Sequence, residues 1–241
     1  MAFITAMVCC PAFTASAADA PVIDTKADQV LRQMSDYVGS LGQFRVHLEN
    51  SVDTFLDCRQ MIQLSRSVDI FVKRPNKFRA NINGDLVAQE FYYDGATITL
   101  SGKRVNFYAT LDAPETLEEA MDYAINSYGL IAPGVDLIDK NSYEVLTAEV
   151  ISGSYVGLST IFGVECHHLA FRGEATDWQI WIENSQKSLP KKIVYTRKLI
   201  AGAPQFTAIL SGWDETPIKD DVFTFTAPEN AEKIDFLPPG Q

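Results

Sequence analysis

Apolar and polar residues alternate with a period of two over most of this 241-residue chain. In its first such run, Phe44, Val46, Leu48 and Val52 alternate with polar or charged residues. Successive side chains of a β-strand point to opposite faces of the sheet, so this alternation is typical of a strand with one face on a core. The chain must therefore build a sheet whose two faces differ in polarity.

Turn sequences separate these runs, among them Asn83-Gly84-Asp85, Asp94-Gly95 and Arg172-Gly173. We find no linker and no low-complexity stretch, which predicts one mainly β (α+β) domain over residues 21–241, with a single antiparallel sheet of about eleven strands. The predicted strands are 44–53, 62–72, 78–82, 87–93, 97–100, 105–109, 155–162, 164–172, 177–184, 191–199, 205–213 and 222–226.

Two segments have helical spacing instead. Residues 24–38 carry an apolar stripe that Gly39 ends, and residues 114–128 carry a second stripe that begins at a proline and ends at Gly129. The stretch 129–138 that follows is apolar but irregular, and a Pro-Gly pair interrupts it. Such a stretch is either packed core or a movable cover over a cavity.

The first twenty residues lack charge between positions 2 and 15 and then carry small residues in two A-x-A patterns. We interpret residues 1–20 as a secretory signal peptide, which is too short to span a bilayer. The alternatives are an N-terminal core helix, which Pro11 disfavours, and lipidation at Cys9 or Cys10, which lack small residues before them. The expected location of the mature chain is the periplasm.

Charge and cysteine content narrow the possible partners. The formal net charge is −11 and no Lys/Arg-rich run occurs, which argues against nucleic-acid binding because phosphate neutralisation needs clustered cations. No segment of the mature chain is long and apolar enough to be membrane-spanning. Cys58 and Cys166 remain after cleavage, and the sequence leaves open whether they form a disulfide or stay unpaired.

Candidate catalytic and metal-binding residues are few. In Cys166-His167-His168, the first and third side chains share one strand face, and a zinc site needs further ligands. No G-x-S-x-G motif occurs and only three histidines are present, so we expect no catalytic residues, no metal, no cofactor and no enzymatic activity. The remaining motifs are Trp178 and Trp181, expected on opposite faces, and the cations Lys73, Arg74 and Arg79, which either clamp an anionic head group or are solvated turn cations.

Several motifs resemble those of the LolA/LolB lipoprotein-carrier superfamily. They are K-R-P-N-K-F-R (residues 73–79), Y-D-G (93–95) and A-P-E-T-L (113–117). The second half, with G-V-E-C-H-H-L-A-F-R (163–172) and D-W-Q-I-W-I-E (177–183), is similar to a bacterial family of predicted periplasmic proteins of unknown function in that superfamily. The resemblance covers residues 25–236. It implies an unclosed β half-barrel with helices across its concave face and an apolar cavity that relatives use for acyl chains.

Strand parity then predicts which residues line such a cavity. In each of these neighbouring strands, the large apolar side chains occupy every second position and therefore point to one face. Antiparallel pairing should bring them together on the concave face of the sheet. The predicted cavity residues are Ile70, Val72, Phe78, Phe91, Tyr93 and Phe107, and the predicted lid residues are Leu117, Met121, Leu130 and Ile131. The same residues would form an ordinary core if the helices sit close to the sheet.

Two functions follow from these patterns. The first is a non-enzymatic periplasmic binder or carrier of a lipid, lipoprotein acyl chains or another hydrophobic small molecule, for which burial of one long chain supplies on the order of 12 kcal/mol gross. The second is an envelope protein–protein interaction module with a filled core and no ligand.

Overall fold

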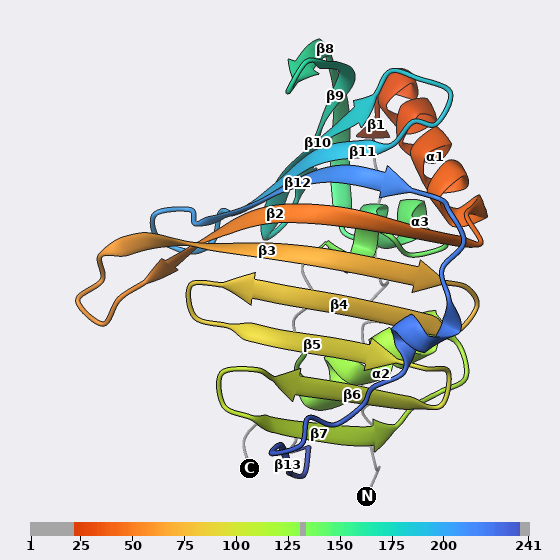
Figure 1. The fold of residues 1–241 in the computed structure, drawn as a ribbon. Coiled ribbons are helices and arrows are strands. Elements are labelled where there is room, and N and C mark those ends of the chain that lie inside the picture. Colours follow the sequence, from red (N-terminus) through yellow and green to blue (C-terminus); the bar gives the residue numbers. More distant parts are fainter. Residues whose placement is uncertain (1–21, 131–133, 237–241) are drawn as a thin grey trace, which may run out of the picture.

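The structure is a computed structural model that describes residues 22–130 and 134–236. The predicted signal peptide and the lid residue Ile131 lie outside the described residues. The described residues form one sheet with strand order β1-β8-β9-β10-β11-β12-β2-β3-β4-β5-β6-β7-β13 (Figure 1). The sheet curves without closing, as the predicted half-barrel requires. In the part of the chain described, no helix is both long and apolar enough to cross a bilayer.

Eleven of the strands are long, and each pairs antiparallel with its neighbours in this group. Their bounds are β2 (Gln43–Phe55), β3 (Met61–Lys73), β4 (Lys77–Gly84), β5 (Ala88–Tyr93), β6 (Thr97–Gly102), β7 (Phe107–Asp112), β8 (Val150–Ile161), β9 (Val164–Gly173), β10 (Thr176–Glu183), β11 (Pro190–Arg197) and β12 (Gln205–Asp214). The short strands β1 (Val22–Ile23) and β13 (Glu232–Lys233) add parallel pairs at the two edges, on β8 and β7.

The long strands form two meanders, β2–β7 and β8–β12, joined where β12 pairs antiparallel with β2. Their outer strands β7 and β8 therefore lie at opposite edges of the sheet. The connection between them must cross one face, and it crosses the concave one as α2 (Leu117–Tyr128), η1 (Val135–Leu137) and α3 (Ser142–Thr147). The helical cover is thus a consequence of the strand order.

Local sequence explains where the helices begin and end. Helix α1 (Thr25–Ser40) starts at Asp24, whose carboxylate accepts hydrogen bonds from the backbone N–H groups of Lys26 and Ala27. Helix α2 starts at Thr116 and stops at Gly129, which adopts the left-handed conformation that glycine tolerates best. Helix α1 contacts the β8–β10 side of the sheet and α3. Its buried face consists of Ala27, Val30, Leu31, Met34, Ser35 and Val38.

The register aligns apolar side chains in rows across β2–β7. The first row is Phe44, Val72, Phe78, Tyr93, Ile98 and Leu111, and the second is Val46, Ile70, Ala80, Phe91, Leu100 and Ala109. The third row is Leu48, Val68, Ile82, Gln89, Gly102 and Phe107. Directly paired residues point to the same face, so each row lies wholly on the concave side.

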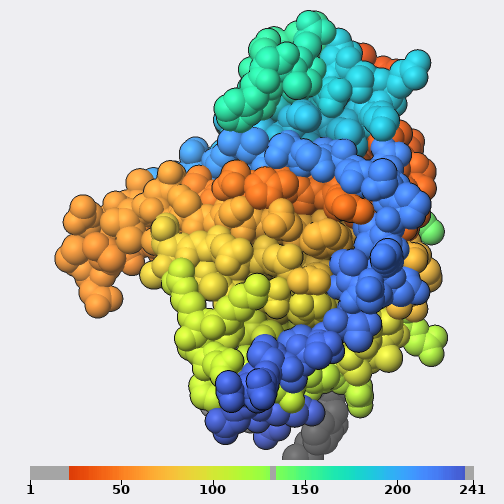
Figure 2. Space-filling model, viewed as in Figure 1, coloured from red at the N-terminus to blue at the C-terminus, as the bar shows by residue number. Residues whose placement is uncertain are grey.

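The predicted strand 222–226 is wrong. Residues Asp220–Phe223 form a 3₁₀ helix, η2, and the chain from there to β13 runs over the outer face of β4–β7 (Figures 1 and 2). Phe225 packs on Tyr92 and Tyr108, with ring centroids 5.5 and 5.1 Å away. Apolar and polar residues alternate in 222–226 because every second side chain packs on the sheet. These residues form no backbone pairing with a strand. We call residues 215–233 the outer strap.

The outer strap should contribute to stability through Phe223, which is fully buried. We expect Phe223→Ala to lower the free energy of unfolding by about 3–5 kcal/mol, because truncating a buried Phe leaves a cavity. Urea denaturation measures this change. Phe162→Ala is the control, since Phe162 is 82% exposed, and its effect should stay below about 0.5 kcal/mol. Equal effects of the two variants would show that the strap is peripheral.

Candidate functional site

An apolar cavity lies between the concave face of the sheet and α2. Its walls include Ile70, Phe78 and Phe91 from the sheet and Met121 and Ala124 from α2, and its volume is about 90 Å³. We call it the inner chamber. Because a water molecule in the liquid takes roughly 30 Å³, this volume corresponds to only a few waters. The inner chamber is therefore nearly filled by the protein's own side chains.

A larger cavity of about 500 Å³ adjoins it, and we call this the outer chamber. The two chambers adjoin, since five residues line both of them: Asn50, Arg66, Ile125, Leu130 and Val135. The outer chamber is bordered further by Val52, Tyr195 and Phe206, and it opens toward Arg197. Its size falls within the roughly 300–1,000 Å³ typical of small-molecule sites.

The structure distributes the predicted cavity residues unevenly. Ile70, Phe78 and Phe91 line the inner chamber, whereas Val72 and Tyr93 are fully buried beside Phe78 and line neither chamber. The Tyr93 hydroxyl donates a 2.5 Å hydrogen bond to the Pro114 carbonyl, which ties β5 to the segment before α2. Both residues thus support the wall from within the core.

Phe107 lies on the predicted face of the sheet but outside both chambers. It ends the third row on β7, is 38% exposed and lines neither chamber. The neighbouring Val105, expected to start this strand, lies in the preceding turn and is also exposed. Parity places a residue on a face of the sheet, but it does not decide whether that residue borders a cavity.

Of the predicted lid residues, Met121 and Leu130 line the inner chamber. Leu117 borders a small adjoining cavity between α2 and Ile138. The outer chamber is also lined by Asn50, Arg66, Tyr195 and Phe206, which the sequence patterns did not predict. The sequence does indicate that Arg66 faces the cavity. It stands between Leu64 and Val68, at an alternate position of the strand that points to the apolar face.

The cations near the β3–β4 turn hold the fold together. Lys73 contacts Asp220 at 2.6 Å, and Arg79 donates hydrogen bonds to the Val222 carbonyl at 3.1 Å and to Glu90 at 3.1 Å. Arg74 donates to Glu118 at 2.9 Å and to the Ile138 carbonyl at 2.6 Å. The first two therefore fasten the outer strap, and the third fastens α2 and the end of η1 to the sheet.

Two titratable groups at the outer chamber are shielded from solvent. Burial, followed by the nearby Asp136 carboxylate, raises the pKa of Tyr195. Burial also raises the pKa of Asp136, and the Asp139 carboxylate adds to the effect. Both shifts favour the neutral forms, so the phenol stays uncharged near neutral pH.

The Cys-His-His motif makes separate structural contacts. Cys166 is buried on the outer face with Trp181 and Val194, and the His168 ring stacks on Trp181 with centroids 4.1 Å apart. On the concave face, the His167 Nδ1 atom lies 2.9 Å from the Tyr155 hydroxyl. Within the described ranges, no group of three or more His, Cys, Asp or Glu side chains is arranged to hold a metal ion.

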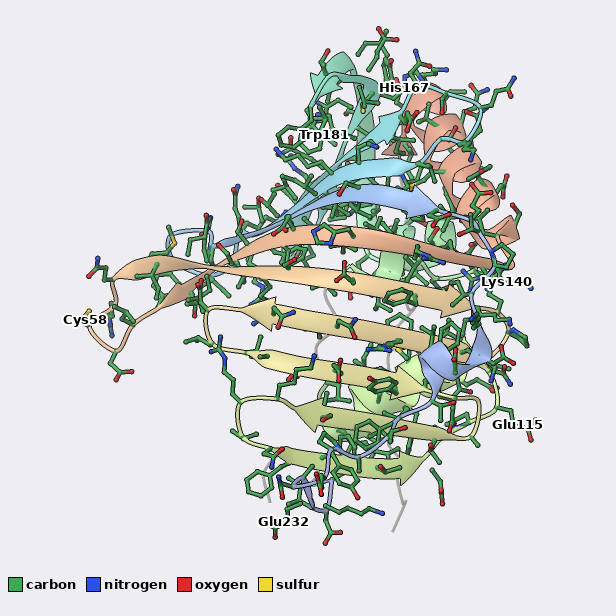
Figure 3. The ribbon with its side chains drawn as sticks, in the orientation of Figure 1. Cys58, Glu115, Lys140, His167, Trp181 and Glu232 are labelled. Atoms are coloured by element: carbon green, nitrogen blue, oxygen red, sulfur yellow. The ribbon has the colours of Figure 1, made fainter. Side chains whose placement is uncertain are left out.

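The tryptophans and cysteines lie as follows. Trp178 is buried on the concave face and stacks on Phe171, whereas Trp181 lies on the outer face. Cys58 and Cys166 are not bridged. Cys58 is at the exposed tip of the β2–β3 hairpin, well away from Trp181, which packs near Cys166 (Figure 3).

The contacts of Arg74 predict how firmly the helical cover is attached. Its side chain is 10% exposed, so Arg74→Met leaves Glu118 and the Ile138 carbonyl without this donor. We expect a loss of about 3 kcal/mol in unfolding free energy and faster amide exchange in α2 and η1. Lys187→Met is the control, because its ion pair with Glu215 is exposed, and it should be nearly neutral. Unchanged exchange in α2 would contradict the anchoring role.

His47 on the outer face should make stability depend on pH. Its ring nitrogens lie 2.7 Å from Asp69 and 2.9 Å from Glu49, and these carboxylates, Asp69 first, raise the pKa of His47 above 6.5. Since the folded pKa exceeds the unfolded one, the stabilisation is complete below about pH 6.5 and is lost as the pH rises through the folded pKa.

We therefore expect His47→Gln to destabilise the fold at about pH 5.5 and to have little effect at about pH 9. Urea denaturation at both pH values measures the difference. His168→Gln is the control, because burial lowers the pKa of His168 and the same pH pattern should be absent. A His47→Gln effect of equal size at both pH values would contradict the charge-based contribution.

Comparisons with known proteins place this geometry in a family. The family described as "Predicted periplasmic protein (DUF2092)" matches residues 27–237. No protein of curated function matches the chain significantly in sequence. An uncharacterized conserved protein from Thermus thermophilus is similar in structure, with a TM-score of 0.53, 8% identity and coverage of 88% of this chain and 99% of that one.

LprF from Mycobacterium bovis is similar at a TM-score of 0.51, with 15% identity and coverage of 87% and 99%. The lipoprotein LppX from Mycobacterium tuberculosis has a TM-score of 0.49, with 14% identity and coverage of 82% and 100%. At these identities the first two similarities show a shared fold and nothing about ligands. Its fold is an open, mainly antiparallel half-barrel. Because the family match spans most of the chain, this periplasmic protein belongs to the DUF2092 family.

Proposed function

We propose that this protein is a non-enzymatic periplasmic binder or carrier of a hydrophobic ligand, such as a lipid or the acyl chains of a lipoprotein. The observation that carries this proposal is the pair of adjoining chambers, inner and outer, beneath α2. Its inner end is lined by apolar side chains of the second row, and an alkyl chain gains about 0.8 kcal/mol for each methylene that it buries.

Ligand entry then requires α2 to move, because the inner chamber of about 90 Å³ is too small for a long chain. Helix α2 suits such movement. Its buried face consists of only Leu117, Ala120, Met121 and Ala124, and Ile125 is 38% exposed over the space. Displacing α2 toward the open outer chamber enlarges the apolar space without separating any strands. In this movement α2 acts as a lid, and the hydrogen bonds of Arg74 to Glu118 and Ile138 stay in place.

The small inner chamber also favours a second candidate, an envelope protein–protein interaction module whose core is already filled. The two candidates differ in one measurable respect. A carrier purified from its own periplasm should hold lipid that native mass spectrometry detects, and it should bind a neutral apolar probe such as dodecanol. Repeated preparations that carry no lipid and bind no probe would leave the interaction module as the function.

Mutation of the lid tests the site itself. The double variant Ile125→Asn/Leu130→Asn replaces two partly exposed apolar contacts of both chambers. We expect dodecanol affinity to fall about tenfold or more, because each change removes apolar contact area, while the melting temperature changes little.

Val156→Asn/Leu158→Asn is the matched control. These residues are 57% and 54% exposed on β8 and line neither chamber, so probe affinity should stay within about twofold. Equal probe affinity in the two double variants would place the binding site elsewhere.

A further inference from the structure

The concave face changes polarity after the third row. The next position along β2, β3 and β4 is occupied by Asn50, Arg66 and Gly84, which pair directly with one another. On the other side of Asn50, β12 contributes Ala208. This polar row borders both chambers through Asn50 and Arg66. An elongated ligand with its chain in the inner chamber would meet these two polar side chains where it enters the outer chamber.

Arg66 differs from the arginines that hold the fold. Arg74 and Arg79 each have carboxylate and carbonyl partners, and Arg45 contacts Asp214 at 3.4 Å. In the described part of the chain, no hydrogen bond or ion pair engages the Arg66 guanidinium, although the residue is only partly exposed and lies on the apolar face. The N–H donors of this guanidinium are therefore available to a bound anion.

The local backbone makes room for this side chain. Gly84 lies directly opposite Arg66, and a Cβ atom at Gly84 would lie 2.7 Å from the Arg66 Cγ atom. The stem of Arg66 therefore lies across the glycine, in space that any other residue would occupy. This packing holds the aliphatic part of the side chain on the sheet and leaves the guanidinium at the border of the chambers.

The charges around the outer chamber favour an anion. Arg197 lines the same chamber at its exposed end, and Asp136 is the one carboxylate among the described lining residues. With Asp136 ionised, the two arginines still give the chamber a net positive charge, in a chain of formal net charge −11. A guanidinium pairs best with planar or tetrahedral oxyanions, namely carboxylate and phosphate.

We infer that the ligand is an anionic amphiphile, whose chain occupies the inner chamber and whose carboxylate or phosphate head is bound by Arg66, with Asn50 and Arg197 beside it. This inference rests on the proposed function, because it assumes that an alkyl chain enters the inner chamber. It adds the chemical class of the head group and the residues that select it.

Three ligands with the same alkyl chain test this assignment: dodecanoate, dodecyl phosphate and neutral dodecanol, each below its micelle concentration. The wild-type protein should bind at least one of the two anions about tenfold more tightly than dodecanol, as expected for a charge-assisted hydrogen bond. The anion that binds more tightly distinguishes a fatty-acid carboxylate from a phosphate head group.

Arg66→Gln should remove this preference, lowering affinity for the favoured anion about tenfold and leaving dodecanol affinity within about twofold. Arg66→Lys should retain part of the preference, because it keeps the charge but loses the paired donors. Arg172→Gln is the matched control, since Arg172 is an exposed arginine outside both chambers.

The outcomes separate the two proposals. If dodecanol and both anions bind equally well to the wild type and to Arg66→Gln, the cavity is a site for neutral chains and the anion assignment is wrong. If none of the three ligands binds the wild type, the proposed carrier function itself fails. Loss of all three ligands in Arg66→Gln, with a lowered melting temperature, would show that Arg66 acts on the fold and would also overturn the assignment.

Discussion

The structure depends on one constraint: a curved sheet that does not close cannot cover its own apolar concave face. Three rows of side chains across β2–β7 present this face, and burying it is the main source of stability that the fold can use. The strand order supplies the cover, because β7 and β8 lie at opposite edges and their connection must cross the sheet. Helix α2 is therefore part of the connection between β7 and β8, and it also covers the candidate site.

The attachment of α2 to the sheet is relevant to the proposed function. At one end Arg74 joins the β3–β4 turn to Glu118 and Ile138 through buried, charge-assisted hydrogen bonds. Farther along, Ile125 and Leu130 line both chambers, and Tyr128 at the end of α2 packs on Phe236 with ring centroids 5.4 Å apart. The proposed entry of a chain would therefore displace the part of α2 around Ile125, while the Arg74 contacts hold its start. The outer strap on the opposite face stabilises the same strands without touching either chamber.

Particular residues show how far sequence reasoning reaches. Phe78 and Phe91 were expected to line the cavity and do line the inner chamber, because parity decides the face and α2 covers the middle of the rows. Phe107 has the same parity but is partly exposed and lines neither chamber. Phe223 and Phe225 alternate like strand residues, yet they belong to a strap, since alternation reports only which side chains face a surface. Arg66 is a charged residue among the apolar residues on the concave side of β3, so a search for apolar lining residues did not predict it.

By itself, the sequence determined most local features: the eleven long strands, the two main helices to within a few residues, the turns and the division of each long strand into an apolar and a polar side. These follow from backbone sterics and side-chain periodicity, which act over a few residues. Gly39, predicted to end the first helix, lies inside α1, which continues to Ser40. Only the tertiary structure decided that β12 pairs with β2, that Asn50 and Arg66 meet beside Gly84, and that a cavity remains beneath α2. Those outcomes depend on contacts between distant segments and on how closely a helix packs on a sheet, which no local pattern specifies.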